Sequence, residues 1–188
     1  MDNRVFNYEW ETFLDEQLLS YNRCKKKAYI CSPLGADSNA EILENMHCAR
    51  AYMIYAAKKL NVIARAPHAY LPLLLCEKIP AERALALEVG IRLLEQSEIL
   101  LVCGTRISAG MRNEIVKAAS LHMDILTFDD DMFVEVKKLV TKSGCGKALV
   151  SIDRNHPVLA SLNPGYSKGG DEPWSDFIKE LTCVHARL

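Results

Sequence analysis

The chain has 188 residues, of which 49% are hydrophobic and 25% are charged, and its net charge at pH 7 is −1. This length and balance are typical of one folded domain, or of one domain with an appendage, and they argue against a disordered chain. A charge near zero also argues against nucleic acid or a membrane surface as the partner, because both are bound through clustered cations.

Apolar runs in the sequence are short. The longest are residues 51–57 and 69–76, well below the roughly 20 residues that cross a bilayer. The N-terminus is acidic and lacks the basic and apolar regions of a secretion signal. Seven cysteines occur at irregular spacings without a Cys-x-x-Cys pair, so we expect reduced thiols. Together these features predict a cytoplasmic protein without a transmembrane segment.

The first predicted element is an N-terminal helix within residues 1–26. Apolar side chains recur there at spacings of three to four, at Trp10, Phe13, Leu14, Leu18 and Tyr21. Such spacing predicts an amphipathic helix. We expect its apolar face to dock on the domain or on a second subunit.

From residue 27 short apolar runs alternate with longer helical patterns, as in a series of βαβ units. We expect strands at residues 28–31, 62–66, 99–103 and 124–128, with helices between them. In the helix after Pro80 the expected inner face is made of Ala84, Leu87, Ile91 and Leu94. The predicted fold class is α/β, a flavodoxin-like or Rossmann-like three-layer sandwich with a parallel sheet.

Residues 129–188 form a C-terminal extension that we expect to act as a lid or an interface. Residues 129–140 have the pattern of a helix and residues 148–152 that of a strand. Residues 163–174 are rich in Gly and Pro, and long irregular segments of this kind are often functional or disordered.

Ligands of open α/β sheets bind beyond the carboxyl ends of the strands. The loops over residues 32–39, 67–72 and 104–110 should therefore converge on one crevice. Ser32, Gly35 and their neighbours can hold a phosphate with loop donors, although ordinary turn residues explain that loop equally well. His68 can contact a base or act as an acid, or it can hydrogen-bond its own loop.

The loop after the third expected strand continues into a segment with more specific chemistry. Ser108 and the small residues around Gly110 can open a helix whose first backbone N–H groups face the crevice. Glu114 lies one turn into this helix. It is either a catalytic carboxylate or an ordinary first-turn acid that the helix dipole stabilises.

Two parts of the sequence carry a likeness to a known family. One is the pattern Ser-x-Gly-x-x-x-Glu-Ile that begins at Ser108, includes Glu114 and follows a strand; the other is Tyr29 in the first strand. Together they resemble the nucleoside 2-deoxyribosyltransferase superfamily, which includes the deoxynucleoside 5′-monophosphate N-glycosidases. The resemblance covers about residues 27–128 and is closest to an uncharacterised branch, through residues 29–33, 66–70, 82–83 and 107–115.

The resemblance implies cleavage or transfer at the N-glycosidic bond of a nucleoside or nucleotide, as in a hydrolase or transferase. Glu114 would be the nucleophile that attacks the anomeric carbon, and Tyr29 would orient it. A carboxylate suits this step, because the transition state resembles an oxocarbenium ion and the retaining mechanism forms a glycosyl-enzyme. The resemblance implies no cofactor and no metal, and the His and Cys spacings suggest no zinc site.

The resemblance also gives the remaining residues a role in substrate binding. Ser32, Gly35 and Ser108 would hold the sugar or the phosphate, His68 would face the base, and Gly110 and Met111 would complete the contact. Relatives are commonly homo-oligomers in which a neighbour closes the site, so we expect the same here.

One position departs from the family pattern. Gly90 stands where members carry an Asp near the sugar and the leaving base. Loss of that acid leaves a second hypothesis open, a non-catalytic sensor module of the same fold that binds a nucleotide-derived ligand.

Overall fold

The structure is a computed structural model that describes residues 25–161, apart from residues 37, 77 and 146. The expected N-terminal helix up to residue 24 and the Gly- and Pro-rich residues 163–174 lie outside the described residues. Within the described ranges, no helix combines the length and apolar character that crossing a bilayer requires.

The core of the molecule is a five-stranded parallel sheet in the order β2-β1-β3-β4-β5. Its strands are β1 (Lys27–Cys31), β2 (Ile63–Arg65), β3 (Ile99–Val102), β4 (Asp124–Thr127) and β5 (Val150–Ile152). This is the flavodoxin-like order, in which the chain moves outward in opposite directions from β1 and β3. The predicted α/β class is confirmed.

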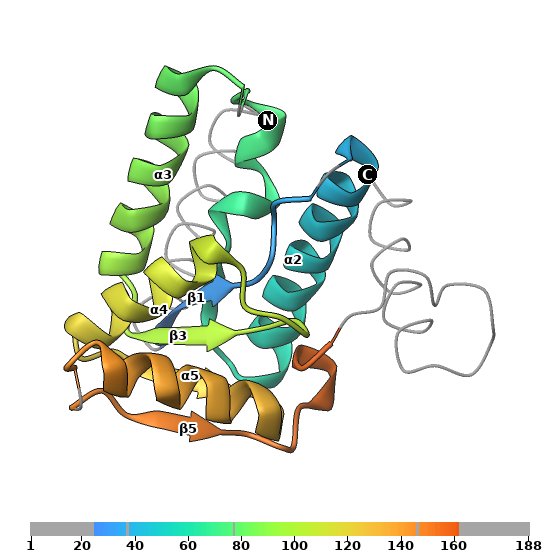
Figure 1. Cartoon of the computed structure of the whole chain (residues 1–188). Coiled ribbons are helices and arrows are strands. Elements are labelled where there is room, and N and C mark those ends of the chain that lie inside the picture. Colours follow the sequence, from blue (N-terminus) through green and yellow to red (C-terminus); the bar gives the residue numbers. More distant parts are fainter. Residues whose placement is uncertain (1–24, 37, 77, 146, 162–188) are drawn as a thin grey trace, which may run out of the picture.

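Helices cover both faces of the sheet (Figure 1). They are α2 (Asn39–Lys59), α3 (Pro80–Glu95), α4 (Ala109–Ser120) and α5 (Asp130–Lys142). Short 3-10 turns are η1 (Pro67–Ala69), η2 (Leu71–Leu73) and η3 (Pro157–Leu159). One apolar cluster joins α2 and η3 to one face, and another joins α4, α5 and the end of α3 to the other. The molecule is therefore a three-layer sandwich.

Alternation along β1 divides its side chains between these two clusters. Ala28 and Ile30 face α2, whereas Tyr29 and Cys31 face the side of α4. All four side chains are buried, as expected for a central strand of a parallel sheet. The strand thus presents Tyr29 and Cys31 together on one face.

Side-chain caps fix where three helices begin. Ser38 caps α2 and bonds reciprocally with Glu41, and Asp129 caps α5. The Ser108 hydroxyl accepts the backbone N–H of Met111 at 3.3 Å and caps α4. The helix that the sequence predicts after Ser108 therefore begins at Ala109, because Ser108 caps its first turn.

The helix expected after Pro80 is present as α3, but its expected inner face is wrong in part. Leu94 is buried, whereas Ala84 is exposed and Leu87 is 62% exposed. The helix packs against η1 and α4 instead. Apolar residues occur on most sides of α3, so their spacing did not single out the face that is buried.

Residues 129–152 complete the sheet. The expected helix and strand are present as α5 and β5, and β5 pairs with β4 while α5 packs on α4. The sheet thus continues beyond residue 128, where the sequence places the start of the C-terminal extension. The cysteines within the described residues, Cys31, Cys48, Cys76, Cys103 and Cys145, are all free thiols, as expected.

Candidate functional site

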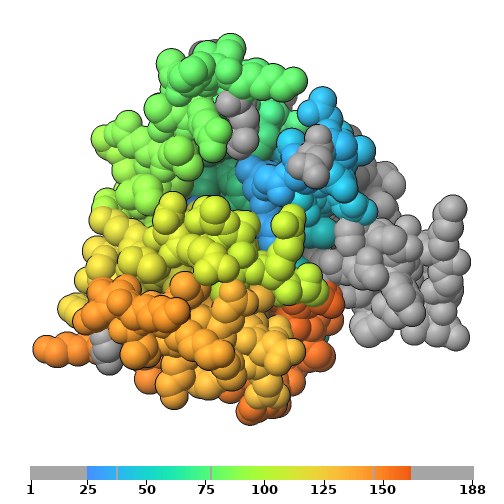
Figure 2. Space-filling view, in the orientation of Figure 1, coloured from blue at the N-terminus to red at the C-terminus, as the bar shows by residue number. Residues whose placement is uncertain are grey.

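The loops that leave β1, β2 and β3 meet at one end of the sheet. Ser32, after β1, hydrogen-bonds His68, in η1 after β2. Arg106, after β3, donates to the carbonyl oxygen of Gly35 at 3.4 Å. On this face Figure 2 shows a hollow bounded by α3 in green, α4 in yellow and the end of β1 in blue. The predicted convergence of the three loops is confirmed.

A hydrogen bond between β1 and α4 forms the centre of this site. The Tyr29 hydroxyl donates to Oε1 of Glu114 at 2.7 Å, across 85 positions in the sequence. Burial raises the pKa of Glu114, while the hydrogen bonds from Tyr29 and Cys31 lower it in part. The carboxyl group is therefore withdrawn from water and accepts a hydrogen bond from the Tyr29 hydroxyl.

Those donors remain protonated near neutral pH. Burial first and the charge of Glu114 second raise the pKa of the Tyr29 hydroxyl and of the Cys31 thiol. The Cys31 thiol also lies 3.9 Å from the carbonyl oxygen of Met111 in α4. The Tyr29 hydroxyl thus orients the carboxyl group, the Cys31 thiol lies on the same face of β1, and neither competes with the carboxyl group for a proton.

Gly90 faces this pair from α3. A Cβ atom added at Gly90 would stand 3.5 Å from the Tyr29 hydroxyl oxygen and 3.9 Å from Cγ of Pro67, both ordinary contacts. The nearby acids of α3 are engaged elsewhere: Glu82 accepts the backbone N–H of Cys76, and Glu88 pairs with Arg92 at 2.6 Å. No acid of α3 therefore fills the space between Gly90 and Tyr29.

A second polar pair joins the loops after β1 and β2. The Ser32 hydroxyl oxygen and Nε2 of His68 lie 2.8 Å apart, and Ser32 is buried. Burial lowers the pKa of His68 to about 4, so its imidazole is neutral at pH 7. The sequence placed both residues at the site, but it did not predict that they bond to each other.

The other expected binding residues lie at the rim or in the core. Gly35 and Gly110 are exposed, and the Ser108 hydroxyl, which accepts from Met111, can still donate its own proton. Met111 differs, because its side chain is buried in the core and its N–H is already used by Ser108. Its expected contact with a ligand thus has less support from the geometry than that of Ser108.

Residues 26–128 match the sequence profile of a family described as a domain of unknown function, DUF7768. The match covers more than half of the chain. The chain belongs to this family. A comparison with curated proteins finds no match. The DUF7768 region holds every site residue described above and has nearly the same bounds as the core expected from the sequence.

Cys31 is the site residue that sequence reasoning missed. It stands two positions after Tyr29 in a strand, and this spacing places both side chains on one face. That signal was available once Tyr29 had been singled out. Among the residues that the structure describes, no group of three or more His, Cys, Asp or Glu side chains is arranged to hold a metal ion.

The low pKa of His68 predicts how stability depends on pH. The folded-state pKa of His68 lies below the ordinary 6.5. The free energy of unfolding is therefore not reduced by this group above pH 6.5, and it falls as the pH drops to about 4. His68→Gln removes this titration while an amide can still bond Ser32. Between pH 7 and pH 4 the variant should lose up to about 3 kcal/mol less unfolding free energy than the wild type.

Urea unfolding at pH 7 and pH 4 measures this difference. The raised pKa of Glu114 acts in the opposite sense, but it is present in both proteins and cancels in the comparison. An equal loss of stability in both proteins would show that His68 titrates normally.

Proposed function

We propose that this protein cleaves or transfers at the N-glycosidic bond of a nucleoside or nucleotide, with Glu114 as the nucleophile. The observation that carries the proposal is the 2.7 Å hydrogen bond from Tyr29 in β1 to Glu114 in α4. It joins the two residues to which the resemblance to nucleoside 2-deoxyribosyltransferases assigns the nucleophile and its orienting hydroxyl.

The surroundings of Glu114 suit attack on an anomeric carbon. The Tyr29 hydroxyl holds the carboxyl group in one orientation, which lowers the entropic cost of reaching the reactive geometry. Burial strengthens the attraction between the carboxylate and the positive charge that develops on the sugar. In this mechanism Oε of Glu114 bonds to the anomeric carbon as the base departs, and water or a second base then resolves the intermediate.

The rim of the site supports a substrate that carries a phosphate. Arg106 provides a cation beside Gly35, and the free proton of the Ser108 hydroxyl lies at the N-terminal end of α4. Both groups interact favourably with an anion, and the positive end of the helix dipole adds to this. A nucleoside 5′-monophosphate is the simplest ligand of this kind.

The Ser32–His68 pair supports a role in departure of the base. When Nε2 of neutral His68 donates to Ser32, the Ser32 proton is free to point toward a nitrogen or oxygen atom of the base. This donor would stabilise the charge that develops on the leaving base, which Gly90 cannot do. We therefore assign Ser32 to the leaving group and His68 to its orientation.

A second function, binding of a nucleotide-derived ligand without turnover, is favoured by one observation. The space beside Tyr29 is bordered by Gly90, and no carboxylate of α3 replaces the missing side chain. A sensor of this fold needs only the binding groups of the three loops.

Base release separates these two functions. Wild-type protein is incubated with deoxynucleosides, their 5′-monophosphates, ribonucleotides and NAD, and free base is measured by chromatography. Glu114→Gln should lower release at least about 10³-fold, because an amide is not a nucleophile. Tyr29→Phe should lower it about ten- to a hundredfold, through loss of a hydrogen bond to a charged group.

Glu114→Gln is a close structural match, because the amide oxygen can still accept from Tyr29. Equal release by the wild type and the Gln variant would remove Glu114 as the nucleophile. Measurable binding without release of base from any substrate would favour the sensor.

The proposed role of Ser32 can be tested with two leaving groups that differ in their need for a proton donor. Ser32→Ala should lower release of an ordinary purine about 10²-fold. It should leave release of an N7-methylated purine nearly unchanged, because that base already carries a positive charge. Equal losses with both substrates would instead place Ser32 on the sugar or the phosphate.

The space at Gly90 allows a test by gain of function. Gly90→Asp places a carboxyl group beside Tyr29 and should raise release of an unactivated base at least about tenfold. Gly90→Ala, which fits the same space without an acid, is the matched control. An increase with Ala as large as with Asp would assign the effect to helix stability rather than to proton donation.

A further inference from the structure

Exposed large apolar side chains gather in one stretch of the described chain. Six of them lie between residues 70 and 87, namely Tyr70, Leu73, Leu74, Ile79, Leu85 and Leu87. Leu74 is 74% exposed and Leu73 is 60% exposed. Single exposed apolar residues are normal on a protein surface, but several in one short stretch of chain favour a surface that something covers. We call these six residues the apolar patch.

The apolar patch spans η2 and the first half of α3. Of the 16 residues of α3, all of which the structure describes, only Leu94 is buried. Ala81, Ala84 and Leu85 are all exposed. They stand at positions i, i+3 and i+4, which lie on one side of a helix. Figure 1 shows α3 at the side of the molecule away from α2. The first half of the helix thus has an apolar side that the described chain leaves uncovered.

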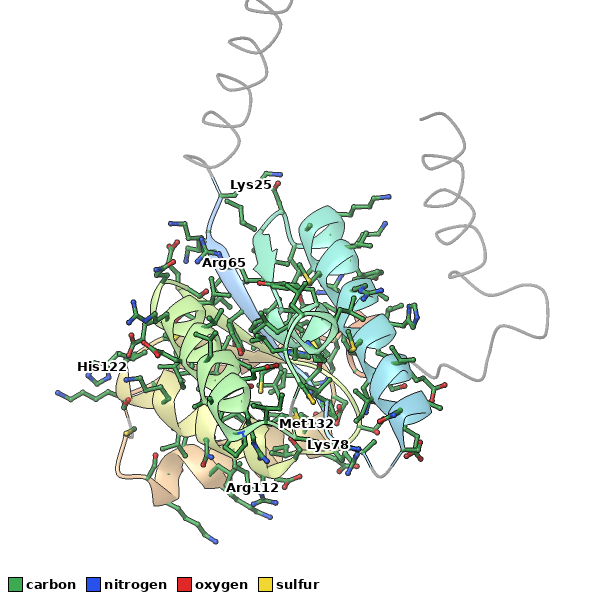
Figure 3. The ribbon with its side chains drawn as sticks, turned by 90° about the horizontal axis from the view of Figure 1, so that it is seen from above. Lys25, Arg65, Lys78, Arg112, His122 and Met132 are labelled. Atoms are coloured by element: carbon green, nitrogen blue, oxygen red, sulfur yellow. The ribbon has the colours of Figure 1, made fainter. Side chains whose placement is uncertain are left out.

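The described chain begins at Lys25, close to the C-terminal end of α3. The backbone N–H of Lys27 donates to Oε1 of Glu98 at 3.2 Å, and the N–H of Glu98 donates to the Lys27 carbonyl oxygen at 2.8 Å. Gln96, the C-cap of α3, accepts from Arg65 at 3.3 Å. Figure 3 labels Lys25 and Arg65 near each other at one end of the view and Lys78, just before α3, far from them.

The length of the preceding segment matches that of α3. As a helix, residues 10–24 would extend about 23 Å, and the 16 residues of α3 extend about 24 Å. A helix that enters at Lys25 and runs beside α3 would bring Trp10 level with the start of α3. The largest apolar side chains of the segment, Trp10 and Phe13, would then lie where the apolar patch is.

The two segments contain charged residues of opposite sign. Lys78 and Arg83 are exposed cations within the stretch that holds the apolar patch. In the N-terminal segment, Glu9 and Glu11 flank Trp10. The same alignment that brings Trp10 to the apolar patch therefore brings acids to these cations. Such pairs fix the register of an interface more than they add to its affinity.

We propose that residues 9–21 dock as an amphipathic helix on the apolar patch of the same chain. Trp10, Phe13 and Leu14 cover the patch residues of η2 and the first half of α3. The segment thereby becomes a further helix of the layer that contains α3 and α4. This inference is independent of the proposed catalytic function.

Trp10 itself reports on this docking. The chain has two tryptophans, Trp10 and Trp174, so Trp174→Phe leaves Trp10 as the single tryptophan fluorophore. In this variant the emission should be blue-shifted and poorly quenched by acrylamide. Adding Leu74→Glu should shift the emission to the red and raise quenching several-fold, because the charge would face the docked indole. Leu74 is largely exposed, so circular dichroism should show an intact fold.

Leu149→Glu is the matched control. Leu149 is 62% exposed but lies just before β5, outside the apolar patch, so its substitution should leave Trp10 emission unchanged. Red-shifted emission in the Trp174→Phe protein, or equal shifts with Leu74→Glu and Leu149→Glu, would overturn the proposal. A blue shift that disappears on dilution, together with a fall in mass from dimer to monomer, would also overturn it in favour of a second copy.

Discussion

Burial of the Glu114 carboxyl group is the constraint on which the centre of this molecule depends. A carboxylate withdrawn from water costs several kcal/mol unless donors replace the solvent. Tyr29 provides such a donor from β1, with the Cys31 thiol on the same face of the strand, and burial keeps both of them protonated. The same contacts fix the position of α4 relative to β1. These contacts thus pack α4 against β1 and prepare a reactive carboxyl group.

The order of the strands explains why polar groups meet at this point. The chain moves outward in opposite directions from β1 and β3, so the loops after these neighbouring strands separate and leave space between them. The loop after β2 closes one side of that space, where His68 reaches Ser32. Residues 32, 68 and 114 come together although they are distant in the sequence, because the carboxyl ends of parallel strands share one edge.

The sequence predicted the elements better than their orientations. Strands and loops were marked by apolar runs and turn residues, and Ser108 was found as the start of a helix. The inner face of α3 was not found, because apolar residues on most of its sides conceal the helical period. The Ser32–His68 hydrogen bond could not be predicted from the sequence either, since it depends on how the loops after β1 and β2 approach each other. Cys31, in contrast, follows from strand alternation once Tyr29 is chosen.

The two sides of α3 connect the candidate site with the apolar patch. One side brings Gly90 to within an ordinary contact of Tyr29, and the opposite side exposes Ala81 and Leu85. A helix that buries so little of its surface against the sheet is held weakly by its own packing. Any segment that covers the outer side would restrict the movement of α3 and hence the width of the space beside Tyr29. An apolar surface on the outer side of α3 would thus help to set the shape of the site.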